Sequence, residues 1–306
     1  MKQLGMLGLG KMGANMARRL ARGGAHVHVW NRSPDVAQSL AQEHANVLAP
    51  GCLAELAAGL ATPRLVWLML PAGQPTDEAL HTLLPLLSPG DTVVDGANAY
   101  YKDSQRRAAQ LAQAGLHFMD AGVSGGIWGL QNGYALMVGG SAEAFAAAEP
   151  FIKILAPAPD AGWLHCGAAG SGHFVKMVHN GIEYGMMQAL AEGLALMKGK
   201  HEFDIDLAAV TEMWRHGSVV RSWLLDLAAQ FLQRDQTLDD IQPYVADSGE
   251  GRWTVLESVE QGTPAPVMSM ALMMRFASQG HGDYANKLLA MMRMGFGGHA
   301  VKEGEA

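Results

Sequence analysis

The sequence predicts an α/β fold in the first half of the chain and an all-helical fold in the second. In the first half, short apolar runs alternate with Ala-rich helical stretches, a pattern typical of strands and helices that alternate on a parallel sheet. After Trp163-Leu164-His165 the strand pattern stops, and long helical stretches rich in Met, Ala and Leu follow. A chain of 306 residues is long enough for two domains. We place the boundary near residue 166, which gives domains at 1–166 and 167–306.

Several short segments are predicted as strands because they are apolar, rich in β-branched or aromatic residues, and bounded by turn residues. They are Leu4–Leu9, His26–Trp30, Leu65–Leu70, Thr92–Asp95, His117–Asp120 and Ala135–Val138. Helices are predicted between them, beginning with Ala14–Arg22 and including the Ala-rich Ala54–Ala61 and Ala142–Ala148. Most of Ser171–Met294 is also predicted as helix.

Composition and charge exclude several classes of protein. The chain is 49% hydrophobic and 17% charged, which is typical of a soluble globular protein. It has no apolar run near the roughly 20 residues that span a bilayer, and its N-terminus lacks a signal-peptide layout, so we expect a cytoplasmic protein. A formal net charge of −7 argues against a nucleic-acid partner. Cys52 and Cys166 have no metal-ligand spacing and are predicted to be reduced, structural cysteines.

A glycine motif follows the first predicted strand. Gly8-Leu9-Gly10-Lys11-Met12-Gly13 has the spacing G-x-G-x-x-G and precedes the predicted helix Ala14–Arg22. Glycines at this spacing permit a tight turn, let the backbone approach a pyrophosphate, and let the helix pack closely on the strand, while the helix N-terminus attracts the anion. The motif therefore predicts a Rossmann-type first domain in which Gly8, Leu9, Gly10, Met12 and Gly13 contact a dinucleotide.

The residues after the second predicted strand bear on the choice of dinucleotide. His26–Trp30 is followed by Asn31-Arg32-Ser33-Pro34 and not by the Asp or Glu that hydrogen-bonds the ribose of NAD. The planar guanidinium of Arg32 can pair with the 2′-phosphate of NADP. We therefore expect NADP, with NAD as the second candidate, and cofactor contacts from Asn31, Arg32 and Ser33. Ser33-Pro34 also has the pattern of an ordinary helix N-cap followed by Pro at the first helical position.

Residues 173–184 place a group of polar side chains on one face of a predicted helix. At 100° per residue these side chains fall within an arc of about 140°. They are Lys176, His179, Asn180, Glu183 and Tyr184. The other side is apolar and is expected to meet a core through Met177, Val178, Ile182 and Met186. A lysine, an amide, a carboxylic acid and a phenol so close together favour a substrate site. The alternative is a solvated helix face in which His179 is an ordinary packed histidine.

A stretch of small residues, Asp120–Gly129, is predicted as a loop after a strand. The backbone N–H groups and the Ser124 hydroxyl of such a loop can bind a carboxylate, although a flexible turn has the same composition. Ser124 lacks the spacing to His and Asp partners that a hydrolase nucleophile has. We therefore expect Ser124 to bind and not to attack.

These motifs resemble those of the 6-phosphogluconate dehydrogenases (decarboxylating) in their short-chain form. The glycine turn, Asp95-Gly96-Ala97-Asn98 and Val123-Ser124-Gly125-Gly126 are shared with the wider β-hydroxyacid dehydrogenases. The stretch from Gly172 to Gly185 is much more specific to the phosphogluconate branch. Further matches are Arg275 and the terminal run from Arg293 to His299. The resemblance covers essentially the whole chain.

The resemblance implies a reaction and the roles of individual residues. The substrate is expected to be 6-phospho-D-gluconate, converted to D-ribulose 5-phosphate and CO2 in the pentose phosphate pathway with reduction of NAD(P) and without a metal. Lys176, if desolvation keeps it neutral, is expected to take the C3 hydroxyl proton, Glu183 to protonate C1 of the enediol, and Asn180 to bridge substrate hydroxyls and the base. The implied substrate contacts are Asn98, Ser124, Gly125, Gly126, His179, Tyr184, Arg275, Arg293 and His299. Leu70 and Asn98 are also expected to contact the cofactor.

The chain departs from the longer members of that family. They contact phosphate with a lysine in a Lys-Gly-Thr-Gly run, where this chain has Ser248-Gly249-Glu250-Gly251, and Ser248 cannot supply that charge. Arg252 lies a few residues away, and we do not transfer the lysine's role to it. The family's lysine in the loop after the fourth strand is Pro71 here. The chain also lacks the second helical half of the longer enzymes.

The end of the chain bears on assembly. In the resembling family an Arg-x-x-Phe-Gly-x-His tail reaches into the active site of a neighbouring subunit, and Arg293 to His299 match it. The Gly-rich segment Gly295-Phe296-Gly297-Gly298 would be poorly ordered unless docked. We therefore expect a homo-oligomer, a dimer or a tetramer, with shared active sites.

Two other functions are compatible with parts of the sequence. A sibling β-hydroxyacid dehydrogenase acting on a small unphosphorylated 3-hydroxy acid would share Lys176 and the glycine turn, but it would have little use for Arg275, Arg293 and His299 together. A non-catalytic dinucleotide-sensing module would keep the glycine turn, but it would not need a Lys-Asn-Glu face.

Overall fold

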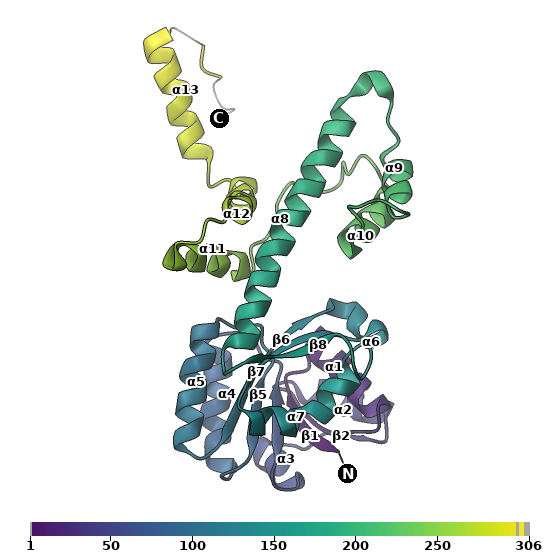
Figure 1. Ribbon diagram of the computed structural model, residues 1–306, viewed down its shortest axis with the longest axis vertical. Helices are drawn as coiled ribbons and strands as arrows, with labels where there is room; N and C mark the ends of the chain where they lie inside the picture. Colours follow the sequence, from purple (N-terminus) through teal and green to yellow (C-terminus); the bar gives the residue numbers. More distant parts are fainter. Residues whose placement is uncertain (1, 298–299, 303–306) are drawn as a thin grey trace. The chain divides into compact units, whose positions relative to one another are not determined.

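The computed structural model describes residues 2–297 and 300–302. The chain divides into two compact units, Met1–Val178 and His179–Ala306 (Figure 1). The first unit is an α/β structure and the second is helical, so the predicted fold class is confirmed. Helix α8 (Ser171–Gly199) runs without interruption through the residue at which the units divide.

An eight-stranded sheet with the order β3-β2-β1-β4-β5-β6-β7-β8 organises the first unit. All neighbouring strands are parallel except β6 and β7. The strands are β1 (Gln3–Leu7), β2 (His26–Trp30), β3 (Val47–Leu48), β4 (Leu65–Leu68), β5 (Thr92–Asp95), β6 (His117–Ser124), β7 (Ala135–Gly140) and β8 (Trp163–Gly167). The strand order reverses between β1 and β4, and ligands of doubly wound sheets bind at the carboxyl ends of the strands at such a point.

Helices cover both faces of the sheet (Figure 1). They are α1 (Lys11–Arg22), α2 (Pro34–Glu43), α3 (Leu53–Gly59), α4 (Gln74–Leu83), α5 (Tyr101–Gln113), α6 (Gly129–Asn132) and α7 (Ala142–Leu155), with 3-10 turns at Leu84–Leu86 and Gly126–Trp128. One apolar cluster joins the sheet to α1, α2 and α7, and a second joins it to α3, α4 and α5. Because side chains alternate along a strand, Met6 enters the first cluster and Leu7 the second.

Two parts of the sheet differ from the prediction. β3 is only two residues long, too short to show an alternating pattern, and β8 is a half-exposed strand at the edge of the sheet. Neither was among the predicted strands. The first part of the expected loop Asp120–Gly129 is instead strand, because β6 continues to Ser124 and pairs antiparallel with β7. A run of small residues is compatible with a strand that packs closely on a helix and also with a loop. The sequence pattern alone does not distinguish the two.

The second unit consists of helices around a small core. Besides α8 it contains α9 (Leu207–Trp214), α10 (Trp223–Leu232), α11 (Glu250–Gln261), α12 (Pro266–Ser278) and α13 (Asp283–Gly297), with a 3-10 turn at His201–Phe203. Its buried apolar cluster is formed by Tyr184, Ala271 and Leu272. Within the described part of the chain, no helix is long and apolar enough to cross a membrane.

The apolar side of α8 was predicted to meet a core, and this is only partly correct. Met177 is 1% exposed, but Ile182 and Met186 are 52% and 46% exposed in the single chain. The buried apolar residues of the second unit, which include Tyr184, Ala271, Leu272 and Leu225, leave these two side chains uncovered. Contiguous exposed apolar side chains of this kind are typical of surfaces that bind another protein surface.

Candidate functional site

The glycine turn between β1 and α1 has the geometry of a dinucleotide site. Gly8 has φ +90°, and a Cβ there would lie 2.3 Å from the Met69 carbonyl oxygen. A Cβ on Gly13 would lie 2.1 Å from the Gly8 carbonyl oxygen, so helix and strand approach as closely as they do only with glycine at 13. A Cβ on Gly10 would meet nothing within 4 Å. The turn is therefore tight at Gly8, packed at Gly13 and open at Gly10, at the N-terminus of α1, where a pyrophosphate can approach.

The end of β2 lies against this turn. The Asn31 side chain accepts a hydrogen bond from the Leu9 N–H (3.0 Å) and donates one to the Ser33 carbonyl (3.2 Å). Asn31 therefore holds the glycine turn in position. Arg32 and Ser33 are exposed beside it, and Pro34 begins α2 with Ser33 as N-cap. The Ser33 hydroxyl makes no capping hydrogen bond.

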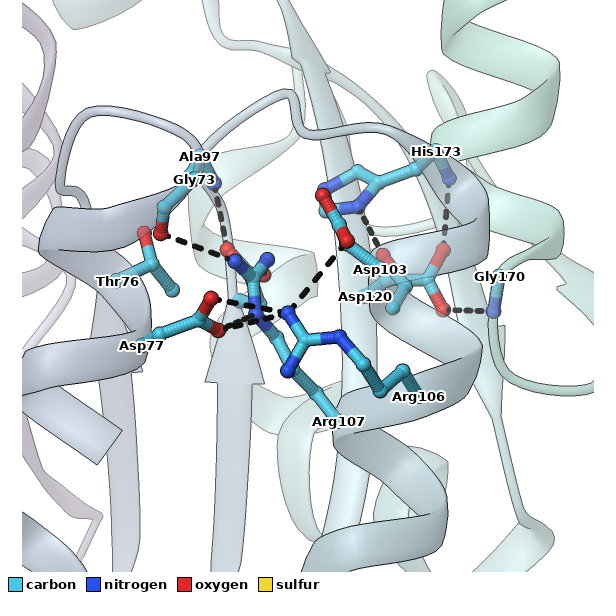
Figure 2. Close-up of polar contacts among 12 residues, drawn as sticks. Gly73, Thr76, Asp77, Ala97, Asp103, Arg106, Arg107, Asp120, Gly170 and His173 are labelled. Atoms are coloured by element: carbon cyan, nitrogen blue, oxygen red, sulfur yellow. Dashed lines mark hydrogen bonds and ion pairs between the residues drawn. The ribbon is translucent and has the colours of Figure 1, made fainter. Parts of the chain in front are cut away.

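A buried ion-pair network holds the loops after β4 and β5 (Figure 2). The fully buried Arg107 on α5 binds the Asp95 carboxylate at 2.9 Å, the Asp77 carboxylate at 2.7 Å and the Gly73 carbonyl at 3.1 Å. Burial alone would raise the pKa of Asp77, but its bonds to Arg107 and Arg106 outweigh this, and the pKa is lowered. The network joins α4 and α5 to the Leu70–Gly73 loop, where cofactor contacts were predicted. Leu70 itself is half-buried.

Asn98 joins the end of β5 to the end of β6. It has φ +48°, a left-handed conformation that Asn tolerates better than most residues. Its side-chain oxygen accepts from the Val123 N–H (2.8 Å), and its side-chain nitrogen donates to the Val123 carbonyl (3.1 Å). The predicted site residues Ser124, Gly125 and Gly126 follow directly. Gly125 and Gly126 have φ +132° and +51°, and a Cβ on Gly126 would meet nothing within 4 Å. The structure thus places Asn98 next to the Ser-Gly-Gly turn.

Helix α8 begins directly on the sheet. The fully buried Asp120 accepts hydrogen bonds from the backbone N–H groups of Gly170 (2.6 Å) and His173 (2.7 Å), which caps the helix N-terminus (Figure 2). Burial raises the pKa of Asp120, while the adjacent His173 and these backbone donors act in the opposite direction. A Cβ on Gly172 would lie 2.5 Å from the Met137 carbonyl oxygen. The start of α8 is therefore fixed against the backbone of β6 and β7.

Lys176 lies near this fixed end of α8. It is 5% exposed, and a Cβ on Gly122 of β6 would lie 2.3 Å from the Lys176 Cβ. The base of the Lys176 side chain can occupy its position only because residue 122 is glycine. The predicted base therefore packs against strand β6 at Gly122, which lies two residues before Ser124.

Three other predicted residues on α8, His179, Asn180 and Glu183, lie close together in the second unit. His179 Nδ1 lies 2.9 Å from Asn180 Oδ1 and 3.9 Å from a carboxylate oxygen of Glu183. The Asn180 amide nitrogen donates to the carboxylate of Glu250, at the start of α11. His179 and Glu183 are each about two-fifths exposed. The predicted polar face therefore continues onto an acid that was not predicted to take part.

Tyr184 forms the centre of a second group in this unit. Its ring is buried, and the Arg275 guanidinium carbon lies 3.4 Å from the ring centroid. Its hydroxyl lies 3.1 Å from the Ser248 hydroxyl and 3.3 Å from an Asp247 carboxylate oxygen. The structure thus brings together two residues predicted to bind substrate, Tyr184 and Arg275, with the segment that replaces the Lys-Gly-Thr-Gly run.

Arg252 in that segment is paired within the protein. It binds the Asp247 carboxylate at 2.8 Å, and its guanidinium lies 5.0 Å from the Phe276 ring centroid. Burial raises the pKa of Asp247, but its bonds to the Gly249 N–H, Arg252 and Tyr184 outweigh it, and the pKa is lowered. An ionised Asp247 therefore accompanies Arg252.

The predicted tail residues are only partly described. Arg293 lies on α13 and its side chain is exposed. His299 lies outside the described residues.

Two predicted cofactor contacts beside the glycine turn are largely covered: Met12 is half-buried and Leu9 is 5% exposed.

Two domain models match nearly the whole chain. The NAD binding domain of 6-phosphogluconate dehydrogenase matches residues 3–166, and the 6-phosphogluconate dehydrogenase C-terminal domain matches residues 172–294. The chain belongs to the 6-phosphogluconate dehydrogenase family. The resemblance inferred from the motifs is thereby confirmed, and the first domain is an NAD(P)-binding domain of an oxidoreductase family.

Two relatives within this family match this chain over almost their whole length. The chain is 41% identical to YqeC of Bacillus subtilis, named as a candidate 6-phosphogluconate dehydrogenase, over 98% of this chain and 99% of that protein. It is 39% identical to the NAD+-dependent, decarboxylating 6-phosphogluconate dehydrogenase of Haloferax volcanii, over 98% of both chains. A solved 6-phosphogluconate dehydrogenase of Plasmodium falciparum, described in apo form and with NADP+ and 6-phosphogluconate, has a TM-score of 0.84 at 30% identity, over 99% of this chain and 67% of that one.

Sequence reasoning missed several residues that hold the candidate site residues in position. Asp120 was predicted to end a strand and Gly122 to lie in a loop, but β6 continues through both and pairs with β7. Arg107 looks like an ordinary helix residue until its carboxylate partners are known. Glu250 could have been found from the sequence. It stands at the threonine of the Lys-Gly-Thr-Gly run of longer family members, so this chain has a negative charge where those members have none.

Proposed function

We propose that this member of the 6-phosphogluconate dehydrogenase family oxidises and decarboxylates 6-phospho-D-gluconate to D-ribulose 5-phosphate and CO2, with NADP as cofactor and NAD as the second candidate, in the pentose phosphate pathway. The observation that carries the proposal is helix α8. It bears a buried lysine at 176, an amide one turn later at 180 and a carboxylic acid two turns later at 183. A reaction that removes a proton, stabilises an enediolate and returns a proton needs these groups.

The glycine turn supports a dinucleotide cofactor, because the space at Gly10 suits a pyrophosphate. Gly8, Leu9, Gly10, Met12 and Gly13 would hold the pyrophosphate, with Leu70 and Asn98 nearer the nicotinamide. A nicotinamide held there would supply the hydride acceptor for oxidation of the substrate at C3. The relatives differ in cofactor, because the Haloferax enzyme is named as NAD+-dependent and the Plasmodium enzyme is described with NADP+. The preference for NADP therefore rests on the exposed Arg32.

Residues of α8 would move the protons. As the hydride leaves C3, Lys176 takes the proton of the C3 hydroxyl, which gives a 3-keto acid. The protonated Lys176 then donates a hydrogen bond to the new carbonyl oxygen and stabilises the enediolate that forms when the carboxylate leaves as CO2. Glu183 returns a proton to C1 of the five-carbon enediol. Asn180 bridges the substrate hydroxyls and the base, which agrees with its place one turn after Lys176.

We assign the remaining predicted residues to the substrate. Asn98, Ser124, Gly125 and Gly126 would contact its carboxylate end, as a turn with accessible backbone N–H groups can. The sugar and phosphate would be bound by His179, Tyr184, Arg275, Arg293 and His299. The contact of Tyr184 with Arg275 supports this assignment, because it places a phenol and a guanidinium together.

One observation favours a second candidate, a sibling β-hydroxyacid dehydrogenase that acts on an unphosphorylated 3-hydroxy acid. Ser248 stands where longer family members have a phosphate-binding lysine, and Arg252 nearby already binds Asp247. The phosphate end of the site is therefore less positive than in those members.

A substrate comparison separates the two candidates. We would measure the absorbance of the reduced cofactor with 6-phosphogluconate, gluconate and 3-hydroxyisobutyrate, each with NADP and with NAD. We expect turnover with 6-phosphogluconate and much less with the two unphosphorylated acids. Turnover of an unphosphorylated acid alone would overturn the proposal in favour of the sibling enzyme.

We also propose a homo-oligomer with shared active sites. The exposed apolar side chains of Ile182 and Met186 on α8 and of Val267 and Met270 on α12 support it, since they leave a large apolar surface on the single chain. Arg293 on α13, with His299, would complete a neighbouring subunit's site.

A further inference from the structure

Glu250 is an acid that the proposed reaction does not use. It lies in the first turn of α11, directly after Gly249, which has φ +94° and forms the N-cap of the helix. From there its carboxylate reaches the Asn180 amide on α8 and accepts a hydrogen bond from it. Both residues belong to the second unit. Glu250 therefore contacts a proposed catalytic residue from a separate helix.

This contact determines how the Asn180 amide is oriented. An ionised carboxylate can only accept hydrogen bonds, whereas an amide has an accepting oxygen and a donating NH2 group. The NH2 group of Asn180 must therefore face Glu250. The amide oxygen then faces the opposite way, where it lies 2.9 Å from His179 Nδ1.

The orientation of Asn180 in turn determines the tautomer of His179. The Asn180 oxygen can only accept, so His179 Nδ1 must carry the hydrogen. The carboxylate of Glu183, 3.9 Å from the same nitrogen, favours the same assignment. In neutral His179 the lone pair then lies on Nε2. The hydrogen-bond partner of one ring nitrogen commonly determines whether the other ring nitrogen donates or accepts a hydrogen bond.

We propose that Glu250 is a positioning residue that orients Asn180 and, through it, sets the Nδ1–H tautomer of His179, so that Nε2 accepts a hydrogen bond from a substrate hydroxyl. That the hydroxyl group belongs to a sugar acid rests on the proposed function. The tautomer of His179 does not depend on it. Neutral His179 with hydrogen on Nε2 would present a donor in place of an acceptor. Glu250 would thus affect recognition of the substrate and leave recognition of the cofactor unchanged.

A spectroscopic test measures the tautomer without any substrate. The full chain would be labelled with 15N-histidine, and the ring nitrogens of His179 identified among the 12 histidines by comparison with His179→Asn. We expect a single Nδ1–H tautomer in the wild type. In Glu250→Gln the new side chain can donate or accept, so Asn180 can turn over and the tautomers should mix. Glu257→Gln, on the same helix, should leave the wild-type spectrum unchanged. An Nε2–H tautomer in the wild type, or an unchanged tautomer in Glu250→Gln, would overturn the proposal.

Kinetics test the consequence for substrate. In Glu250→Gln we expect KM for 6-phosphogluconate to rise about tenfold, the effect of one lost hydrogen bond, with KM for NADP unchanged. Glu250→Asp keeps a carboxylate and should recover part of the loss. Equal losses in Glu250→Gln and Glu250→Asp, or equal effects on both KM values, would indicate a structural role and refute the proposal. If the wild type does not turn over 6-phosphogluconate, the proposed function fails, while the spectra still decide the tautomer.

Discussion

At the level of single residues, Gly8, Gly10 and Gly13 lack a side chain for three different reasons. Gly8 needs its positive φ, Gly13 needs the close approach to the Gly8 carbonyl, and Gly10 has an ordinary φ of −63° with open space beside it. Only the first two requirements concern the folded chain itself. We expect the third to concern a bound ligand, and this difference can be measured.

Substitution by alanine should separate folding from cofactor binding. Gly10→Ala should keep or slightly raise stability, by about 0.4–1 kcal/mol, because Ala adopts this φ without strain and restricts the unfolded chain. It should nevertheless weaken NADP binding, since the methyl group occupies the space for the pyrophosphate. Gly13→Ala should lower the free energy of unfolding by about 1–3 kcal/mol through overpacking. Urea unfolding and cofactor titration would measure both effects. Normal NADP affinity in Gly10→Ala would contradict this account of the turn.

We propose that Arg32 sets the choice between NADP and NAD. Arg32→Ala should weaken NADP much more than NAD, because only NADP has the 2′-phosphate that a guanidinium can bind in a bidentate pair. A charged hydrogen bond contributes about 1.5–3 kcal/mol, so the ratio of the two Kd values should change about 10- to 100-fold. Fluorescence titration with each cofactor measures the ratio. Equal weakening of both cofactors would mean that Arg32 is structural.

Site residues that follow a local pattern could be predicted from the sequence, and those that depend on distant partners could not. The glycine turn is local, and so is the spacing of Lys176, Asn180 and Glu183 on a helix. Gly122 is different, because its importance comes from a lysine far along the chain that packs on it. Glu250 likewise matters through Asn180, 70 residues away.

At the level of elements, the start of α8 is held by β6 and β7 and by the Asp120 cap. The loops after β4 and β5 are held by α5 through Arg107. Long periodic elements such as α8 could be predicted because periodicity accumulates over many residues. The two-residue β3 and the extension of β6 could not, because they form through pairing with strands that a local window does not include.

Neighbouring arginines on α5 allow a matched test of the loop network. Arg107→Leu would leave the buried Asp95 carboxylate without its guanidinium, and such a break costs about 3–5 kcal/mol. Arg106→Leu removes a guanidinium whose side chain is 51% exposed, from the same Asp77, and should cost about 0–1 kcal/mol. Urea unfolding followed by circular dichroism would measure both. Similar losses in the two variants would show that the Asp95 pair is not the anchor of these loops.

At the level of the whole molecule, the second unit has more apolar surface than its own core can cover. Side chains on α8, α12 and α13, including Ile182, Val267 and Tyr284, are 52%, 66% and 79% exposed. The sequence pattern of α8 predicted burial of its apolar side, and such a pattern cannot tell whether a helix is buried within its own chain or against another. This is why Ile182 and Met186 were assigned to a core that the single chain does not provide.

Subunit mixing tests the proposed shared sites. We expect Lys176→Met and Arg293→Ala each to be inactive alone, and their mixture to regain activity, because some mixed sites combine an intact lysine from one chain with an intact tail from the other. The mixing must permit subunit exchange, which a tag on one chain would confirm. Exchange without recovered activity, or a fully active monomer, would show that the tail does not act in a neighbouring subunit.

The stoichiometry and rate of CO2 release test the central claim, that Lys176 is the base of an oxidative decarboxylation. With 6-phosphogluconate labelled at C1, the wild type should release CO2 in equal amount to the reduced cofactor. In Lys176→Met both should fall together by about 10²- to 10⁴-fold, the usual contribution of general catalysis, while the Kd for cofactor stays normal. Near-normal turnover by Lys176→Met, or reduced cofactor without CO2 in the wild type, would contradict the account.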